Sequence, residues 1–228
     1  MSSGSSYTYT ETLAESEIRI LKVLPGAFGT PICCDLIIVT SQHLSMPYTA
    51  LSYTWGDPTL DKTILMNGKS HAVTTNLYDA LRYLRRDEEP LHIWIDAVCI
   101  NQNNLPEKTA QVRNMDRVYK RAASTVIWLG PPRDGLHDAL RNTIQLGRLE
   151  KTAENVERHY PSFKDIFARP WFARLWVMQE VVLSRKCIAH CGHESCSFEE
   201  LAEVPASFSW DFQSSQVWSD VALGSRTL

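Results

Sequence analysis

The chain has 228 residues, of which 44% are hydrophobic and 21% charged, and its formal net charge at pH 7 is −3. This composition is ordinary for a globular protein, and without a basic excess nucleic acid is not expected as a partner. No apolar run approaches the length of a membrane span, and the first residues do not form a signal peptide. Six cysteines are too few for a disulfide framework in a chain of this length. We therefore expect a cytoplasmic protein with reduced thiols and no membrane association.

The N-terminal part of the chain predicts a tail followed by antiparallel strands. Residues 1–15 are rich in serine, threonine and tyrosine, which predicts a disordered tail. The segments 16–24 and 33–40 are predicted to pair as a hairpin. A second hairpin is predicted over residues 63–74, because Asn67-Gly68 stands between two short apolar runs.

The segment 91–130 predicts a strand–helix–strand unit. It begins with a β-branched apolar run and ends with a second run at 125–129. Between them lies the pattern of a helix N-terminus, formed by Asn104, Pro106 and Glu107. The strands of such a unit are parallel and its crossover is right-handed. With a strand at 48–54 in the centre, the sequence predicts an α/β fold: a mostly parallel central sheet, flanked by helices, with the antiparallel hairpins attached to it.

A buried helix is predicted from about Pro170 to Ser184, because apolar residues surround nearly its whole circumference. Glu180 stands in its middle, beside Gln179. A buried carboxylate must be paired, protonated or directed at a cavity. Two interpretations stay open: a functional carboxylate, or an ion pair with one of three nearby arginines, Arg169, Arg174 and Arg185. Beyond about residue 206 the pattern fades, which predicts a linker or the start of a further region over 206–228.

Polar and aromatic side chains gather where two predicted strands end. Asp96 closes one strand, and Asn101 and Gln102 follow it; Trp55-Gly56 closes the strand at 48–54. Open α/β sheets bind ligands outside the carboxyl ends of their strands, so these positions are candidates for a binding site. Each also has a simpler interpretation. Asp96 can cap a loop, the tryptophan can pack, and the glycine can supply a turn.

Four potential metal ligands lie close together near the C-terminus: Cys187, Cys191, His193 and Cys196. Their spacing is not that of paired C-x-x-C knuckles. We favour a hairpin that happens to carry cysteines, and we predict no metal site.

Three ordered blocks resemble the heterokaryon incompatibility (HET) domain of filamentous fungi. They are Tyr48-x-Ala-Leu-Ser-Tyr-x-Trp-Gly56, then Trp94-Ile-Asp-Ala-Val-Cys-Ile-Asn-Gln102 with Glu107 and Gln111, and Arg169-x-Trp-Phe-x-Arg-x-Trp-Val-x-Gln-Glu180. The resemblance covers roughly residues 16–205. It implies an effector domain that triggers regulated cell death when genetically different cells fuse. Such domains often precede NLR-type receptor modules and are expected to be switched by self-association.

HET domains are in turn distantly similar to TIR domains, which have a flavodoxin-like sheet and many of which cleave NAD with a glutamate on a late helix. This similarity implies that Glu180 is catalytic and that NAD is a substrate; no bound cofactor is expected. The residues implied to contact the substrate are Tyr53, Trp55, Gly56, Asp96, Asn101, Gln102, Arg169, Arg174, Trp176 and Gln179. Tryptophans would stack on a base and arginines would meet phosphates. The alternative is a non-catalytic adaptor that signals through self-association, in which Glu180 is structural.

Overall fold

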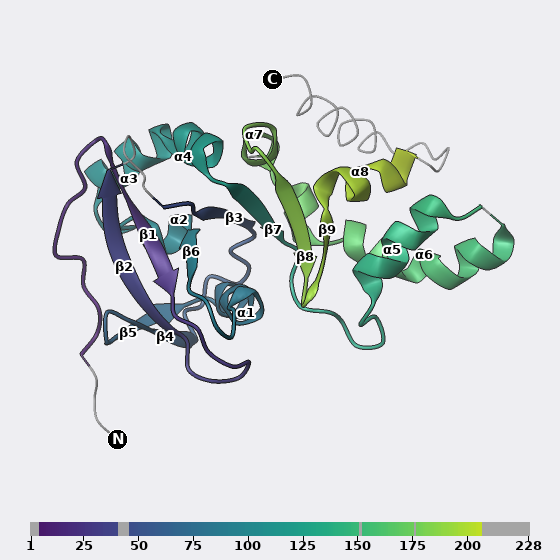
Figure 1. Cartoon of the computed structure of the whole chain (residues 1–228), viewed down its shortest axis with the longest axis horizontal. Helices are drawn as coiled ribbons and strands as arrows, with labels where there is room; N and C mark the ends of the chain where they lie inside the picture. The colour runs from purple at the N-terminus through teal and green to yellow at the C-terminus, as the bar shows by residue number, and fades with distance from the viewer. Residues whose placement is uncertain (1–4, 41–45, 151, 176, 207–228) are drawn as a thin grey trace. The chain divides into compact units, whose positions relative to one another are not determined.

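The computed structural model describes residues 5–40, 46–150, 152–175 and 177–206 (Figure 1). The chain forms two compact units. The first contains the residues up to 51 together with 55–123, and the second contains 52–54 together with the residues from 124 onward.

Six strands form the sheet of the first unit, in the order β5-β4-β2-β1-β6-β3. Their bounds are β1 Glu17–Val23, β2 Cys33–Thr40, β3 Thr49–Tyr53, β4 Lys62–Met66, β5 Lys69–Val73 and β6 Leu91–Trp94. The pairs β1–β2, β1–β6 and β4–β5 are antiparallel, whereas β2–β4 and β3–β6 are parallel. The sheet is therefore mixed, and Figure 1 shows β1 and β2 running side by side within it.

The predicted mostly parallel sheet is wrong for this unit. Both predicted hairpins form, but they are part of the sheet and not attachments to it, because β1 pairs with β6 and β2 pairs with β4. Ile20, Leu21 and Val23 are all 0% exposed, so β1 carries core residues on both faces. The alternation of apolar and polar residues predicts which strand pairs with β1 in a hairpin. It does not predict which strand pairs with the opposite edge of β1. The predicted place of residues 125–129 beside 48–54 stays a prediction, since these residues lie in the second unit.

The turn between β4 and β5 confirms the asparagine–glycine prediction. Asn67 and Gly68 both have positive φ angles, 49° and 74°, as a two-residue hairpin turn of this type requires. The Asn67 side chain also accepts a hydrogen bond of 2.8 Å from the backbone N–H of Leu36 on β2. The turn residue therefore ties the hairpin to the neighbouring strand.

Four helices belong to the first unit: α1 Thr75–Leu84, α2 Asp96–Cys99, α3 Leu105–Arg113 and α4 Met115–Arg121. The predicted N-cap is confirmed, because Asn104 Oδ1 accepts the N–H of Glu107 at 3.1 Å. The chain leaves the helical conformation at Asn114 (φ −98°, ψ 5°), so the predicted single helix is two. The ring of Tyr119 on α4 lies edge-on to Trp94 of β6, with centroids 5.8 Å apart, and this contact packs α4 on the sheet.

Residues 5–15, where the sequence predicts a disordered tail, lie against the first unit from Ser5 onward. The N–H of Tyr7 donates to the carbonyl of Ser70 on β5 at 2.8 Å. The hydroxyl of Tyr9 donates to the carbonyl of Val98 on α2, also at 2.8 Å. These hydrogen bonds give the segment a defined path over the unit.

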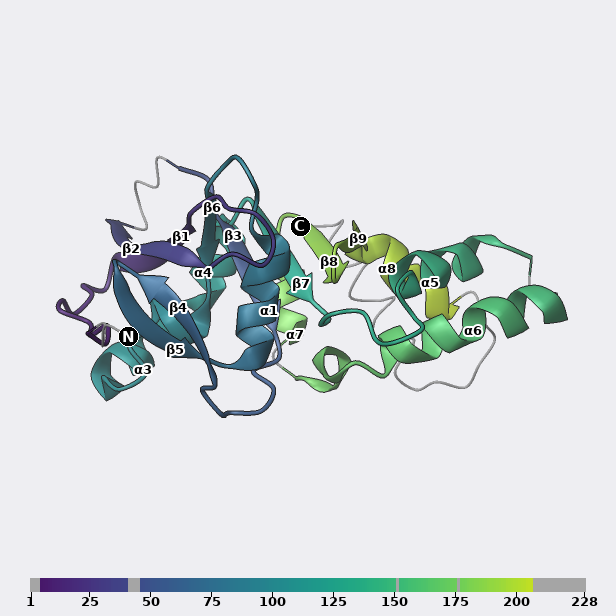
Figure 2. The same cartoon turned by 90° about the horizontal axis from the view of Figure 1, so that it is seen from below.

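The second unit combines three strands with four α-helices and a 3-10 turn among its described residues. The strands are β7 Ser124–Trp128, β8 Cys187–Cys191 and β9 Glu194–Ser197, with β7–β8 parallel and β8–β9 antiparallel. The helices are α5 Ala139–Arg148, α6 Ala153–Phe167, the turn η1 Pro170–Ala173, α7 Val177–Val182 and α8 Phe198–Ala206. Both Figure 1 and Figure 2 show α5 and α6 side by side. The core of this unit includes Trp171 and Phe198, each 1% exposed.

The predicted helix from Pro170 to Ser184 is interrupted. The turn η1 ends at Arg174, whose backbone is extended (φ −86°, ψ 133°), and α7 begins only at Val177. Leu175, one of the apolar residues of the predicted buried helix, is 89% exposed. The apolar spacing alone does not reveal that the chain leaves the helix at Arg174, a change that brings its guanidinium beside Glu180.

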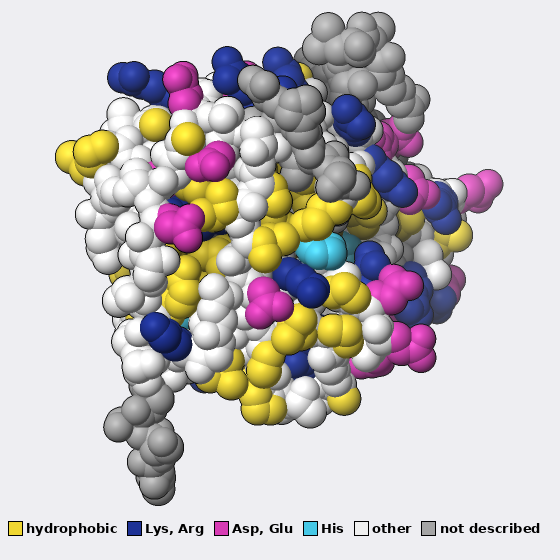
Figure 3. All heavy atoms as spheres, turned by 60° about the vertical axis from the view of Figure 1, so that its left-hand side comes forward, with side chains coloured by type: hydrophobic (Ala, Val, Ile, Leu, Met, Phe, Trp, Pro, Cys, Tyr) yellow, Lys and Arg dark blue, Asp and Glu magenta, His cyan; other side chains and the backbone are white. Residues whose placement is uncertain are grey.

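On the face drawn in Figure 3, basic and acidic side chains are interspersed and no single basic patch forms. In the part of the chain that the structure describes, no helix has the length and apolar character needed to cross a bilayer.

Candidate functional site

The predicted site residues divide between the two units. Trp55, Gly56, Asp96, Asn101 and Gln102 belong to the first, and Tyr53, Arg169, Arg174, Gln179 and Glu180 to the second. Trp176 lies outside the described residues. The single pocket predicted to join the two groups stays a prediction, and each group is a cluster in its own unit.

In the first unit, Asp96 organises the loop at the end of β6. It is the first residue of α2, and its Oδ1 accepts the N–H of Ala97 at 2.7 Å. Its Oδ2 accepts the indole N–H of Trp55 at 3.0 Å, and its backbone carbonyl accepts the side-chain amide of Gln102 at 2.8 Å. The structure therefore brings together three predicted residues and shows the loop-capping role of Asp96.

This cluster has two features that a ligand could use. The indole of Trp55 is 41% exposed although Asp96 fixes its orientation. The side-chain oxygen of Gln102 is buried and has no hydrogen-bond partner among the described residues.

Gly56 has a φ of +73°, so it supplies the turn that follows Trp55.

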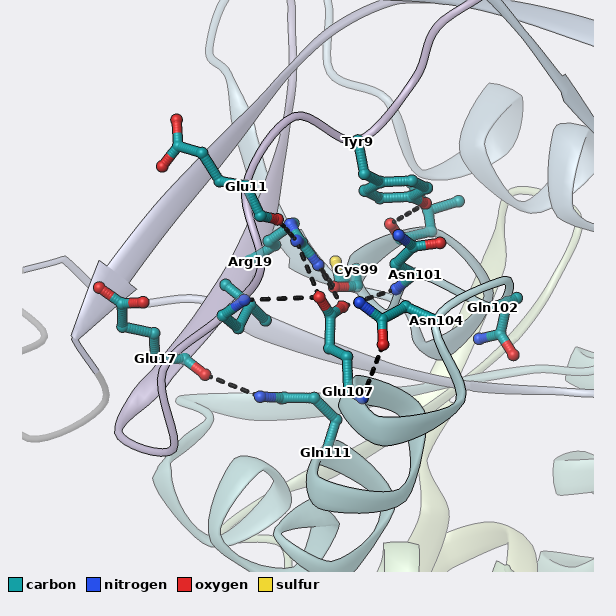
Figure 4. Close-up of polar contacts among 12 residues, drawn as sticks. Tyr9, Glu11, Glu17, Arg19, Cys99, Asn101, Gln102, Asn104, Glu107 and Gln111 are labelled. Carbon is teal, nitrogen blue, oxygen red and sulfur yellow. Dashed lines mark hydrogen bonds and ion pairs between the residues drawn. The ribbon is translucent and has the colours of Figure 1, made fainter.

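Asn101 takes part in a different cluster, which is centred on a buried ion pair (Figure 4). Arg19 on β1 and Glu107 on α3 are 2% and 4% exposed, and their Nη1 and Oε1 atoms are 2.6 Å apart. The N–H of Asn101 donates to the same Oε1 at 2.9 Å, and Arg19 donates to the carbonyl of Cys99 at 3.2 Å. Asn101 therefore helps to fasten α3 and its loop to the sheet.

The carboxylate of Glu107 is held in its charged form. Burial raises the pKa of Glu107, but hydrogen bonds from Arg19 and from the N–H of Asn101 outweigh burial, so that the pKa lies below its ordinary value. Gln111, one helical turn further, is 2% exposed and donates to the carbonyl of Glu17 at 2.9 Å. These two members of the second sequence block are thus structural.

In the second unit, Glu180 is 3% exposed and belongs to a chain of polar contacts. Its Oε1 lies 3.1 Å from Nη2 of Arg174, and its Oε2 lies 3.4 Å from Nη1 of the same residue. The hydroxyl of Ser52 donates a short hydrogen bond to Oε2. Trp171 in turn donates its indole N–H to Ser52 at 2.7 Å. Of the three arginines considered as partners, Arg174 is the one that pairs with Glu180.

Arg169 is not placed to meet a phosphate. It is 5% exposed, and its Nη2 lies 2.6 Å from the Asp165 carboxylate. Its Nη1 donates to the carbonyls of Leu129 and Pro131 at 3.3 and 2.9 Å. A Cβ at Gly130 (φ +105°) would lie 3.1 Å from that Nη1, so a glycine is needed there. Arg169 therefore closes the loop after β7.

The remaining candidates are structural or carry no ligand signal. Tyr53 is 3% exposed, and Gln179 accepts the N–H of Leu183 through its backbone carbonyl.

The cysteines considered as metal ligands lie on β8 and β9, and burial raises the thiol pKa of Cys187 and of Cys196 to about 12. No group of three or more metal-ligating side chains forms among the described residues.

Sequence reasoning missed four residues of these clusters: Ser52, Trp171, Arg19 and Tyr9. Arg19 could have been found as a charge placed directly between Ile18 and Ile20, because a charge within an apolar run needs a buried partner. Ser52 and Trp171 stand inside the first and third sequence blocks. Nothing in their spacing indicates that they contact each other across 119 residues.

Polar contacts link residues of the three sequence blocks in pairs: Trp55 with Asp96 in the first unit, and Ser52 with Trp171 and Glu180 in the second. Residues 48–180 match the family described as heterokaryon incompatibility protein (HET), so the chain belongs to this family. The matched segment begins at Tyr48, the first residue of the first sequence block, and ends at Glu180, the last residue of the third block.

A curated relative supports the assignment. The chain is 30% identical over 254 residues to "Heterokaryon incompatibility protein 6, OR allele" of Neurospora crassa. The match covers 86% of the present chain and 37% of the relative, so the chain spans little more than a third of that protein's length. No solved structure matches the chain.

Proposed function

We propose that this chain is the effector domain of a fungal incompatibility protein. It triggers regulated cell death by cleaving NAD or a related nucleotide, with Glu180 as the catalytic carboxylate. The family and the name of the Neurospora crassa relative support the incompatibility role. Cell death is what the resemblance to HET domains implies, and the nucleotide chemistry is supported by the distant resemblance to TIR domains and by the environment of Glu180.

The observation that carries the proposal concerns the buried carboxylate of Glu180: its orientation is fixed, but its hydrogen-bonding positions are only partly filled. Ser52 and Arg174 both donate to Oε2 of Glu180, while Oε1 accepts only from Arg174 among the described residues. A carboxylate has about four lone-pair positions, so Oε1 retains capacity for a ribose hydroxyl. Arg174 is 25% exposed at its side chain, so the pair is not sealed from solvent.

The proposed reaction is hydrolysis of the bond between ribose and nicotinamide. As the bond breaks, nicotinamide keeps the electron pair and leaves as a neutral base, and positive charge builds on the ribose. The carboxylate of Glu180 stabilises that charge in a setting of low dielectric. Water then adds to the anomeric carbon and releases a proton, giving ADP-ribose. Arg174 and Ser52 hold the side chain of Glu180 in one orientation.

A second candidate is a non-catalytic adaptor that signals by self-association, together with NLR-type receptor modules. The observation in its favour is the pairing of Glu180 with Arg174 at 3.1 Å, which is also the geometry of a purely structural ion pair. Under this alternative, clustering alone transmits the signal, since a weak interface is controlled by local concentration.

Nicotinamide release from NAD separates the two candidates. The purified chain is assayed alone and fused to a strong oligomeriser, with NAD and with related nucleotides as substrates. The effector proposal expects turnover that rises on clustering, with nicotinamide and ADP-ribose in equal amounts. Cell killing by the clustered chain without consumption of any nucleotide would replace it with the adaptor.

A further inference from the structure

The N-terminal segment 5–15, here called the arm, occupies a defined surface of the first unit. At one end it covers the edge of the sheet. Ser6 forms a parallel bridge with Ser70 on β5, the N–H of Tyr7 donates to Ser70 at 2.8 Å, and the N–H of Ser70 donates to Ser5 at 3.2 Å. Edge strands offer unpaired backbone groups to any extended chain, and the arm takes up these groups at one position of β5.

The middle of the arm rests on the buried ion pair (Figure 4). The guanidinium of Arg19 lies over the ring of Tyr9, 4.9 Å from its centroid. Arg19 also donates to the carbonyl of Glu11 at 2.5 Å, and the N–H of Leu13 donates to Glu107 at 3.4 Å. Two backbone groups of the arm therefore complete the hydrogen bonding of a buried charged pair.

The two sides of this contact differ in burial. Every residue from Ser5 to Glu15 is exposed or half-buried, whereas Arg19 and Glu107 beneath them are buried. A terminal segment with no buried residue detaches at a small fraction of the cost of global unfolding. The surface it leaves would contain an ion pair that has lost its two hydrogen bonds to the arm, those with Glu11 and Leu13, and an open strand edge. Both features favour binding of another chain segment.

We propose that this surface, formed by the outer edge of β5 and the Arg19–Glu107 pair, is an interaction site for the arm of a second copy of the chain. The occupant is a second copy because that copy has the same sequence at residues 5–15. Its arm can therefore make the same hydrogen bonds on this surface without any new contact. In dilute solution each arm stays on its own surface because its effective concentration there is high. Clustering raises the concentration of foreign arms and permits exchange. The proposal stands independently of the chemistry of Glu180.

Disulfide trapping between full-length copies tests the exchange. One copy carries Ser6→Cys and the other, labelled with ¹⁵N, carries Ser70→Cys. Residues paired across adjacent strands lie about 5 Å apart, which suits a disulfide. The copies are mixed in a thiol–disulfide buffer at rising concentration and fused to an oligomeriser, and linked peptides are identified by mass spectrometry so that native cysteines do not interfere. The expected result is a link between positions 6 and 70 of different copies, which increases with clustering.

Two matched variants sharpen the experiment. Ala72→Cys on the receiving copy places an exposed thiol two residues along the same strand, and it reports random collision, so its yield should be lower. Tyr9→Phe on the donating copy removes the hydrogen bond to Val98 from the arm on its own surface and on a foreign one alike. An exchange that conserves contacts should therefore give an unchanged yield, and a clear loss of yield would contradict it.

A chain with both Ser6→Cys and Ser70→Cys reports the contact within one copy. If this double variant links internally while no link forms between clustered copies, the exchange does not occur. If it fails to link even internally, the arm does not occupy the surface and the proposal falls with it. Equal yields of disulfide at positions 70 and 72 would show that the links arise from random collision, and this result would also contradict the proposal.

Discussion

At the scale of single residues, Arg19 and Glu107 form a buried ion pair in the first unit, with side chains only 3% and 1% exposed. Two charges removed from water are stable only while they face each other and their other hydrogen-bonding positions are filled. Here Asn101, Cys99 and the arm fill them. The consequence is that loss of one partner is far more damaging than loss of both.

We predict that Glu107→Gln destabilises the chain by about 3–5 kcal/mol, because it leaves Arg19 as an uncompensated buried charge. Urea unfolding of the purified variant measures this free energy. Glu89→Gln is the control: Glu89 is 75% exposed at its side chain and pairs with Arg86, so its loss should cost less than about 1 kcal/mol. Equal stability of the two variants would show that the buried pair does not stabilise the fold.

Because of the same pair, the free energy of unfolding depends on pH in the acidic range. The folded-state pKa of Glu107 is lowered, so its contribution is present above the unfolded pKa of about 4.3 and is lost as the pH falls through the folded value. This loss occurs at a lower pH than the effect expected from His190.

His190 on β8 predicts a loss of stability at a higher pH. Burial lowers its pKa to about 4, so the folded chain keeps it neutral while the unfolded chain protonates it below about pH 6.5. The unfolded state therefore binds more protons in this window, and stability falls as the pH drops from 6.5 towards 4. Between pH 7.5 and 5 we expect the parent to lose about 2 kcal/mol more than His190→Gln, measured by urea unfolding at each pH. Parallel losses in the two proteins would exclude this role for His190.

At the scale of elements, the β4–β5 hairpin depends on its turn. Gly68 has a φ of +74° and open space around its Cβ position, so only backbone conformation disfavours a larger residue. Gly68→Ala should therefore cost about 1 kcal/mol, measured as a shift in thermal or urea unfolding. Gly68→Asn should cost less, because asparagine adopts the left-handed region more readily. A stabilising Gly68→Ala would contradict the turn geometry.

The elements also show how far sequence patterns reach. Asn67-Gly68 and Asn104 act through their immediate neighbours, so both the hairpin and the N-cap were predictable. The interruption at Arg174 was not, because it serves a contact with Glu180 that only the folded chain creates. The pairing of β1 with β6 was likewise hidden, since an apolar strand does not encode its second neighbour.

The same distinction holds for the site residues. Asp96, Trp55 and Gln102 were recognisable because strand ends are common places for ligands, and the structure joins them. Arg169 carried the same charge signal as Arg174, but it is used by Asp165 and two carbonyls. Charge and position in the sequence do not separate a structural arginine from one beside a candidate catalytic carboxylate.

At the scale of the whole molecule, the proposed function combines a HET-family domain with one reactive carboxylate and with activation by clustering. This function requires that Glu180 acts chemically and is not merely paired with Arg174. Arg174→Lys keeps the positive charge and serves as a second variant, which should retain the fold and part of the turnover. Glu200→Gln, at an exposed pair with Arg148, controls for the loss of a glutamate elsewhere.

The most direct measurement is nicotinamide release from NAD by clustered Glu180→Gln, with its unfolding midpoint measured alongside. The substitution keeps the shape of the side chain and removes its charge. We predict a folded protein whose turnover falls on the order of 10²-fold or more, while Glu200→Gln matches the parent. A folded Glu180→Gln that releases nicotinamide at the parental rate would contradict the catalytic role of this residue.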